Sequence, residues 1–239
     1  GPFDLDKSVR QDPPVQVFAP GTTPAYSNYG MSLAGYIVER VSGESFEDYV
    51  REHVLEPAGM DSSTFDQPLP ERLAGRMANG YKTTGGRAQP FELIDSPAGG
   101  MTTSGTDAGR FMLAMLNQSQ GGALLEEGTW KQMFGPGLGA DQLGTLAEGK
   151  QMGLGFFDES RNGHQIVGHE GGTVFQAELE IYPNDGSGVF VAVNGEGKDG
   201  AAALKDDLMR GFSDRYYPGS EPDVEDRPSV SESRQHARV

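Results

Sequence analysis

Two short stretches of the sequence carry residues that could do acid–base chemistry. The first is Tyr26-Ser27-Asn28, which follows a loop rich in proline and glycine. Tyr26 and Asn28 are two residues apart, so in an extended or turn conformation both side chains could point the same way. A phenol and an amide directed into one cleft could transfer protons and bind a carbonyl group. The alternative interpretation is an ordinary loop followed by a helix that Asn28 caps.

The second stretch is Gly168-His169-Glu170-Gly171-Gly172-Thr173. Glycines at this density let a ligand approach the backbone closely. His169 could donate a hydrogen bond or carry a proton near neutral pH, and the N–H groups of Gly171 and Gly172 could hold an oxyanion. The alternative interpretation is a glycine-rich turn with a structural histidine.

The first stretch must be positioned by helices. A helical period follows Asn28 and predicts a helix that packs on a core and stops at Ser42-Gly43. Its apolar positions are Met31, Ala34, Ile37, Val38 and Val41. Ser45 and Asp48 resemble a capping box and predict a second helix that runs until Pro57. Two further helices are predicted around Phe111–Leu116 and Leu124–Met133.

The second stretch must be positioned by strands, because the period of the sequence changes from helical to two beyond Gly153. Asn162-Gly163 favours a tight hairpin turn, and the alternation up to Asn194 predicts an antiparallel meander of three or four strands. A final amphipathic helix, Ala201–Tyr217, should cover one sheet face. Its apolar positions are Ala201, Leu204, Leu208, Phe212 and Tyr216. The predicted fold class is α+β.

The composition excludes several kinds of function. The 239 residues carry a formal net charge of −16 with a pI near 4.5, which argues against binding to nucleic acid or to an anionic membrane. There is no cysteine, so disulfides and thiolate chemistry are excluded. No apolar run is long enough to span a membrane, and no signal peptide is visible in this sequence. No cofactor is expected.

Several blocks, in this order, resemble the penicillin-binding-protein and serine β-lactamase superfamily, in its class C-like branch of β-lactamases, D,D-peptidases and carboxylesterases. The blocks are Phe18-x-Pro20-Gly21-Thr22, Tyr26-Ser27-Asn28, Val41-Ser42-Gly43, Glu56-Pro57-Ala58-Gly59-Met60 with Ser62-Ser63-Thr64, Pro97–Thr103 and His169-Glu170-Gly171. Blocks in a fixed order are more specific than any single one. The resemblance implies a β-lactamase/D,D-peptidase-like fold over residues 16–217 and an extracytoplasmic location.

The resemblance also implies roles for individual residues. Tyr26 would be the general base or proton relay for a serine nucleophile, and Asn28 would bond the amide or carbonyl of the substrate. His169 would replace the lysine of the family's Lys-Thr-Gly motif. Gly172 would give one N–H to the oxyanion hole, and Gly171 and Thr173 would line the substrate site.

The sequence departs from the family at the nucleophile, because no Ser-x-x-Lys or Thr-x-x-Lys occurs in the 239 residues. A tyrosine, whose ordinary pKa is about 10, is a poor base at neutral pH unless nearby cations stabilise its phenolate. We therefore expect the C-terminal portion of a serine hydrolase, incomplete at its N-terminus. A complementary N-terminal fragment or second chain would then complete the sheet and cover an exposed apolar face.

The predicted organisation has three parts: an irregular segment 1–15, the serine-hydrolase domain 16–217, and a polar linker or disordered tail 218–239. Within the domain, Gly59–Gly100 is predicted to be a long surface excursion that shapes substrate access. The substrate would be a small ester, amide or peptide.

Two other functions are possible on this sequence. One is a non-catalytic homologue or fragment that serves as a ligand-binding or interaction module. The other is a metal hydrolase that uses His164, His169 and Glu170. The metal site is disfavoured, because a turn and a strand, rather than a helix face, relate the two histidines and no third ligand stands out.

Overall fold

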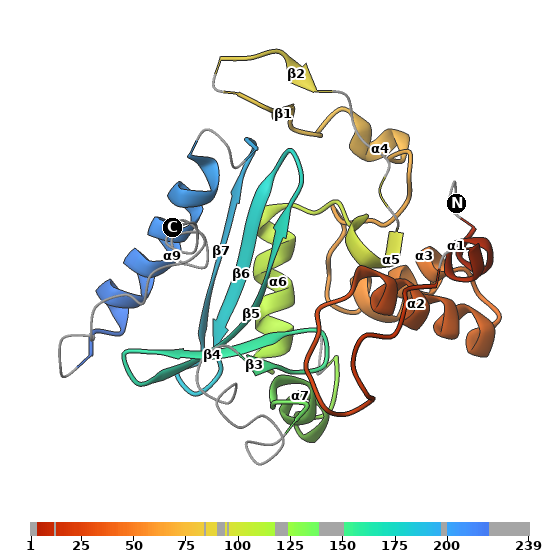
Figure 1. Ribbon diagram of the computed structural model, residues 1–239. Coiled ribbons are helices and arrows are strands. Elements are labelled where there is room, and N and C mark those ends of the chain that lie inside the picture. The colour runs from red at the N-terminus through yellow and green to blue at the C-terminus, as the bar shows by residue number, and fades with distance from the viewer. Residues whose placement is uncertain are drawn as a thin grey trace, which may run out of the picture.

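The computed structural model describes residues 4–11, 13–83, 85–89, 94, 96–117, 124–138, 151–196 and 200–219. It consists of an antiparallel sheet with helices on both faces and a group of helices to one side (Figure 1). The predicted α+β fold class is thus confirmed. Within the described ranges, no helix is both long and apolar enough to cross a membrane. The predicted tail lies outside the described residues from residue 220 onward.

Within the described residues, the sheet contains five strands in chain order, each antiparallel to the next. They are β3 (Gln151–Met152), β4 (Phe157–Arg161), β5 (His164–Gly172), β6 (Gln176–Tyr182) and β7 (Ser187–Val193). Asn162 and Gly163 connect β4 to β5 with φ angles of 54° and 83°, as the predicted tight hairpin requires. The sheet is the predicted antiparallel meander, but it has five strands where three or four were predicted.

One face of the sheet packs against α6 (Gly105–Met115) and α7 (Glu127–Phe134). The buried core between them consists of Met115, Trp130, Phe134, Val167 and Ile181. Val167 and Ile181 are cross-strand partners on β5 and β6, so their side chains lie on the same face. By the alternation of strand side chains, His169 lies on this face as well, and Glu170 lies on the opposite one.

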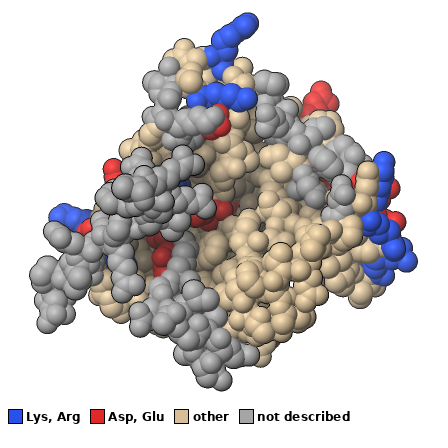
Figure 2. Space-filling view, in the orientation of Figure 1, with Lys and Arg blue, Asp and Glu red and all other residues tan. Residues whose placement is uncertain are grey.

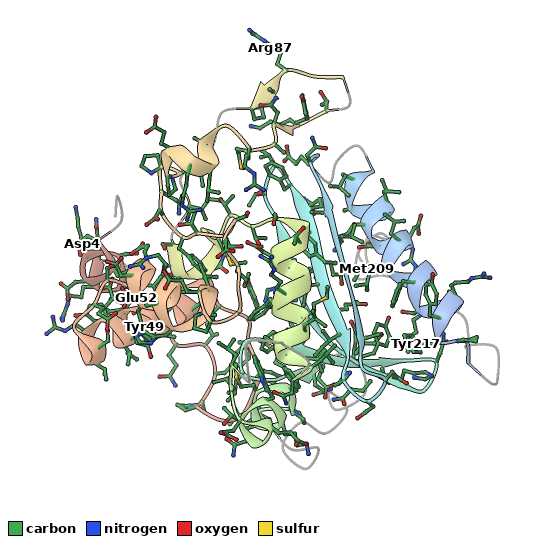
Figure 3. The ribbon with its side chains drawn as sticks, turned by 180° about the vertical axis from the view of Figure 1, so that it is seen from behind. Asp4, Tyr49, Glu52, Arg87, Met209 and Tyr217 are labelled. Carbon is green, nitrogen blue, oxygen red and sulfur yellow. The ribbon has the colours of Figure 1, made fainter. Side chains whose placement is uncertain are left out.

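The opposite face is covered by α9 (Ala201–Tyr216), as predicted, and Phe212 packs against the buried Tyr182, but the rest of the predicted packing face is largely wrong. Leu204 and Leu208 are 51% and 48% exposed, whereas Lys205, Met209 and Ser213 are buried. Figure 3 shows Met209 on the side of α9 that faces the sheet. The physical reason is that β5 and β6 carry polar groups on this face: Lys205 pairs with glutamates of β5 and β6, and the Ser213 hydroxyl lies 2.5 Å from that of Tyr182.

The helical group contains α1 (Leu5–Gln11), α2 (Asn28–Ser42), α3 (Phe46–Val50), the π-helical turn η1 (Arg51–Leu55) and α5 (Ser96–Gly99). The predicted irregular segment 1–15 therefore includes a helix. Leu5 and Val9, one turn apart, bury one side of α1, and the Tyr29 hydroxyl of α2 donates to the Val9 carbonyl at 3.0 Å. A contact that is distant in sequence thus stabilises a helix with little period of its own.

The predicted apolar face of α2 is also wrong, because Met31, Ile37 and Val41 are 44%, 54% and 83% exposed. The helix packs instead through its small residues Ser32 and Gly35. A Cβ atom at Gly35 would lie 2.7 Å from Cγ of Pro97, so α5 approaches the backbone of α2 too closely for a side chain. In the described part of the chain, the apolar face points to solvent.

The segment Gly59–Gly100 contains α4 (Glu71–Ala74) and a hairpin of β1 (Gly80–Tyr81) and β2 (Ala88–Gln89), which projects from one end of the molecule (Figure 1). The backbone N–H of Tyr81 donates to the Asn194 carbonyl at 3.1 Å, so the hairpin is tied to the end of β7. A Cβ atom at Gly80 would lie 2.5 Å from Cγ2 of Val174. The base of the hairpin therefore packs on the loop that follows β5.

Candidate active site

Tyr26 lies in the extended chain just before α2. The N-cap of this helix is Ser27, with φ −150° and ψ 114°, and its Oγ accepts the N–H of Gly30 at 3.0 Å. Asn28 is the first helical residue, so the interpretation in which Asn28 caps the helix is wrong. The cap leaves Tyr26 outside the helix and 53% exposed.

Tyr26 lies beside His169. Their ring centroids are 5.7 Å apart, although one residue precedes a helix and the other lies on β5. Phe157 of β4 joins them, 5.1 Å from His169 in a stacked arrangement and 6.3 Å from Tyr26. Three aromatic rings from three separate elements therefore form one cluster.

The sequence analysis missed Phe157. Phe156 and Phe157 are adjacent, and Phe156 packs edge-on against Phe134 in the core. Adjacent positions in extended chain face opposite ways, so this pair signalled that one ring would leave the core, but not what that ring would meet.

The structure determines which nitrogen of His169 carries the proton in the neutral ring. Nδ1 lies 2.6 Å from the backbone carbonyl oxygen of Glu170. A carbonyl oxygen can only accept a hydrogen bond, so Nδ1 must be the donor. The neutral ring therefore keeps an unprotonated Nε2, which can take up a proton or accept a hydrogen bond.

Gly171 and Gly172 complete β5, opposite Ala177 and Gln176 of β6. Both glycines are exposed. The pairing of β5 with β4 ends earlier, at Gly168, so His169–Gly172 extends past β4 and is paired on the β6 side. This part of β5 is called the overhang below.

Thr173 follows the overhang in a tight turn. Its backbone N–H donates to the Phe175 carbonyl at 2.8 Å, and its Oγ1 accepts the N–H of Phe175 at 3.1 Å. The side chain of Thr173 therefore shapes this turn, and the residue remains exposed.

Asn28 lines a pocket of about 510 Å³. The pocket lies between α1, α2 and α5, and Ser8, Ser32 and Gly99 are among its lining residues. Asn28 and Tyr26 flank the N-cap of the same helix, so the pocket opens beside the start of α2. The predicted site residues thus lie in the Tyr26–His169 contact, in the overhang and the turn that follows it, and in this pocket.

The arrangement of the histidines does not fit a shared metal site. His164 and His169 are five residues apart on β5, and their side chains therefore point to opposite faces. Nδ1 of His164 lies 2.9 Å from Asp185 Oδ2, far along the strand from the overhang. Elsewhere in the described ranges, Glu44, Glu52 and His53 bring three ligand atoms within 4.8 Å of one another, on the outside of the helical group.

Known proteins resemble this chain in sequence and in fold. The family model described as Beta-lactamase matches residues 3–212. A β-lactamase of Yersinia enterocolitica is 29% identical over 100 residues, which are 42% of this chain and 25% of that protein. The aligned regions span between 20% and 28% of the length of the first curated relatives.

Solved structures share the fold. The octameric penicillin-binding protein homologue from Pyrococcus abyssi has a TM-score of 0.64 and 26% identity, over 82% of this chain and 44% of that one. A D-stereospecific amidohydrolase from a Streptomyces species has a TM-score of 0.65 and 18% identity, over 85% of this chain and 57% of that one. This chain thus covers about half the length of these two structures.

Proposed function

The chain belongs to the Beta-lactamase family, and on this premise we propose that it forms part of a serine hydrolase that cleaves ester or amide bonds through an acyl-enzyme. The observation that carries the proposal is the contact between Tyr26 and His169, with ring centroids 5.7 Å apart. A tyrosine can serve as a base when a cation nearby stabilises its phenolate. His169 becomes that cation when its free Nε2 takes up a proton.

The proposed roles follow from position. Tyr26 takes the proton of the attacking serine and gives it to the departing alcohol or amine, and the free Nε2 of His169 exchanges protons with the site. The backbone N–H of Gly172 stabilises the oxyanion from the exposed overhang, while Gly171 and Thr173 border the substrate. Asn28 bonds the carbonyl or amide of the substrate from the pocket beside α2.

The nucleophile is proposed to come from a segment outside these 239 residues, because they contain no Ser-x-x-Lys. Two features of the described structure support this. β7 is a terminal strand of the sheet, and an edge strand can pair with another segment. Ile37 and Val41 expose apolar surface on α2, which a further segment could bury.

The second candidate is a ligand-binding or interaction module without catalysis. The same absence of Ser-x-x-Lys favours it, since a chain with Tyr26 and His169 but no serine nucleophile can bind a substrate without forming an acyl-enzyme. The two candidates differ in whether a covalent bond forms.

A covalent probe tests the proposal. The longest native polypeptide that contains this chain and the 239-residue chain alone are each treated with a fluorescent penicillin and with a fluorophosphonate. Intact-mass and peptide mapping then locate any adduct. We expect one adduct, on a serine of an upstream Ser-x-x-Lys, in the longer protein and none in the shorter one.

The other outcomes are informative as well. Labelling of neither protein by either probe would contradict the hydrolase and support the binding module. Labelling of a serine within the 239 residues would contradict an upstream nucleophile.

A further inference from the structure

A buried cation lies directly behind the overhang. The side chain of Lys205, on α9, is 3% exposed, and its Nζ lies 2.9 Å from Glu170 Oε2 and 2.8 Å from Glu178 Oε2. Asp206 approaches the same nitrogen at 3.2 Å. Burial opposes the charged form of Lys205, but the hydrogen bonds that its ammonium donates to Glu170 and Glu178 outweigh this effect, and the pKa of Lys205 is raised.

The cation offsets the repulsion between the two glutamates. Glu170 on β5 and Glu178 on β6 are direct cross-strand partners, and like charges in that relation repel each other. The side chain of Glu178 is 12% exposed, so water screens the repulsion only in part. Lys205 turns a repulsive pair into an attractive bridge that spans the two strands.

The bridge holds the part of β5 that has lost its pairing with β4. The last β4 pair is Phe157 with Gly168, whereas Glu170 and the two glycines that follow are paired with β6. An interaction that strengthens the pairing of Glu170 with Glu178 therefore holds the overhang in place. Lys205 does so from the face opposite His169.

Glu170 connects the bridge to His169 through its own backbone. Its carboxylate meets Lys205 on one face of the sheet, and its carbonyl oxygen accepts the Nδ1–H of His169 at 2.6 Å. Movement of Glu170 would move this acceptor and release the imidazole from a single tautomer.

We propose that Lys205 is a positioning residue: by clamping Glu170 to Glu178, it fixes the overhang and so sets the tautomer and orientation of His169. The inference rests on the proposed function only for its effect on catalysis. Its structural part concerns the ring of His169 and can be measured in the 239-residue chain.

The first measurement is a long-range ¹H–¹⁵N correlation spectrum of histidine-labelled chain, with His169→Asn used to assign the signals. The wild type should show a protonated Nδ1 and an unprotonated Nε2 for neutral His169. Lys205→Met should shift these nitrogen signals toward the mixture of tautomers of an unrestrained ring, and Lys205→Arg, which keeps the cation, should restore much of the wild-type pattern.

The matched control is Met209→Ala, which removes a buried side chain from the same helix, one turn further on. It should lower the melting temperature and leave the His169 signals in place. If Lys205→Met does not fold, Glu170→Gln is used, which should shift the signals in the same direction by less. Wild-type His169 signals in a folded Lys205→Met or Glu170→Gln chain would overturn the proposal.

The second measurement is the acylation rate of the longest native polypeptide. Lys205→Met should lower it by about 10- to 100-fold, the loss expected when a reacting group moves by about 1 Å. Met209→Ala should acylate at close to the wild-type rate, and a Lys205→Met protein that does so too would overturn the catalytic part. If the wild type itself is never acylated while the His169 signals change as expected, the proposed function fails and the positioning role stands.

Discussion

Tyr26 and His169 are held by their sequence neighbours rather than by each other. The Ser27 cap fixes the chain beside Tyr26, and the Glu170 carbonyl fixes the imidazole of His169. Neither side chain is deeply buried in the described structure. At the residue scale, changes at these two positions should therefore affect chemistry more than folding.

The first prediction concerns the phenol of Tyr26. In the longest native polypeptide, Tyr26→Phe should lower the rate of acylation by about 10²- to 10⁴-fold, the usual contribution of a positioned proton-transfer group. The control is Tyr36→Phe, which removes a hydroxyl of α2 that accepts from Arg10 and donates to Asp6, both on α1. Acylation rates from stopped-flow fluorescence would compare the variants, and equal rates for wild type and Tyr26→Phe would contradict the proposed base.

The second prediction concerns alkaline stability. Burial raises the pKa of Tyr182 to about 12, against about 10 in an unfolded chain. The folded state therefore holds this proton more tightly. The raised pKa contributes about 2 to 3 kcal/mol to the free energy of unfolding. This contribution is fully present below about pH 10 and is lost as the pH rises to about 12.

Tyr182→Phe isolates this contribution. Near pH 8 the variant should be less stable than the wild type by about 1 kcal/mol, because the hydrogen bond with Ser213 is lost. The difference in stability between the two proteins should disappear or reverse by about pH 12. The titration of Lys205 changes the stability of both proteins equally and does not contribute to this difference. Urea unfolding across this range is the measurement, and a pH-independent difference would contradict the raised pKa.

At the scale of elements, the β1–β2 hairpin supports the loop after the overhang. A methyl group at Gly80 would lie 2.5 Å from Cγ2 of Val174 and 3.2 Å from the ring of Phe175. Val174 is β-branched and stiff, so it cannot move aside easily. The third prediction is that Gly80→Ala lowers the free energy of unfolding by about 1 to 3 kcal/mol, as measured by urea unfolding.

Two further variants control this prediction. Gly75→Ala, at φ −72° with no atom within 4 Å of the added carbon, should change stability by less than about 1 kcal/mol. Val174→Ala combined with Gly80→Ala should recover part of the loss, because the smaller side chain makes room. No recovery in the double variant would place the strain elsewhere.

Elements were predictable from sequence where a local signal determines them. The Asn162-Gly163 turn, the Ser45 cap and the stop of α2 at Gly43, which has φ 80°, are all in the structure. The faces on which α2 and α9 pack were not predictable from their apolar periods. A close backbone approach at Gly35 and a buried ion at Lys205 outweigh the apolar periods, and both depend on segments that are distant in sequence.

The candidate site shows the same division. The resemblance assigned Tyr26 and His169 to one site; the structure places their rings 5.7 Å apart, and their catalytic roles stay predictions. Lys205 carries no local signal of a role, since it resembles a solvated helix lysine. The Phe156-Phe157 pair signals only that one ring leaves the core, not which residue that ring contacts. The register of β4 and β5 brings Phe157 to His169, and the packing of α9 on the sheet brings Lys205 to Glu170.

At the scale of the whole molecule, the dominant property is the excess of acidic residues, 35 against 19 basic ones. On the face in Figure 2, Lys and Arg gather over the hairpin at the top and over the helices at the right edge, while much of the middle is uncharged. Salt weakens exposed ion pairs, such as those of Arg51, but each is worth only about 0 to 1 kcal/mol. Repulsion among the excess acidic groups should outweigh them.

The fourth prediction is therefore that salt stabilises this chain. Raising NaCl from about 0.05 M to about 0.5 M should raise the melting temperature by a few degrees, as measured by calorimetry, because the screening length falls severalfold. An uncharged osmolyte is the control, since it favours the folded state without screening charge, and its effect should be independent of salt. A melting temperature that falls with salt would show that the ion pairs dominate.

The bridge between Glu170, Glu178 and Lys205 also has an evolutionary consequence. Loss of one carboxylate leaves a buried ammonium short of partners, and loss of the ammonium leaves two carboxylates opposed, so a change at one of these positions is costly by itself. Substitutions at these three positions should therefore accompany one another among related sequences. Related sequences with a small neutral residue at the position of Glu170 are expected to have replaced the lysine of the last helix as well. The residue between the histidine and the glycine of the His-Glu-Gly motif should therefore predict the residue at the position of Lys205.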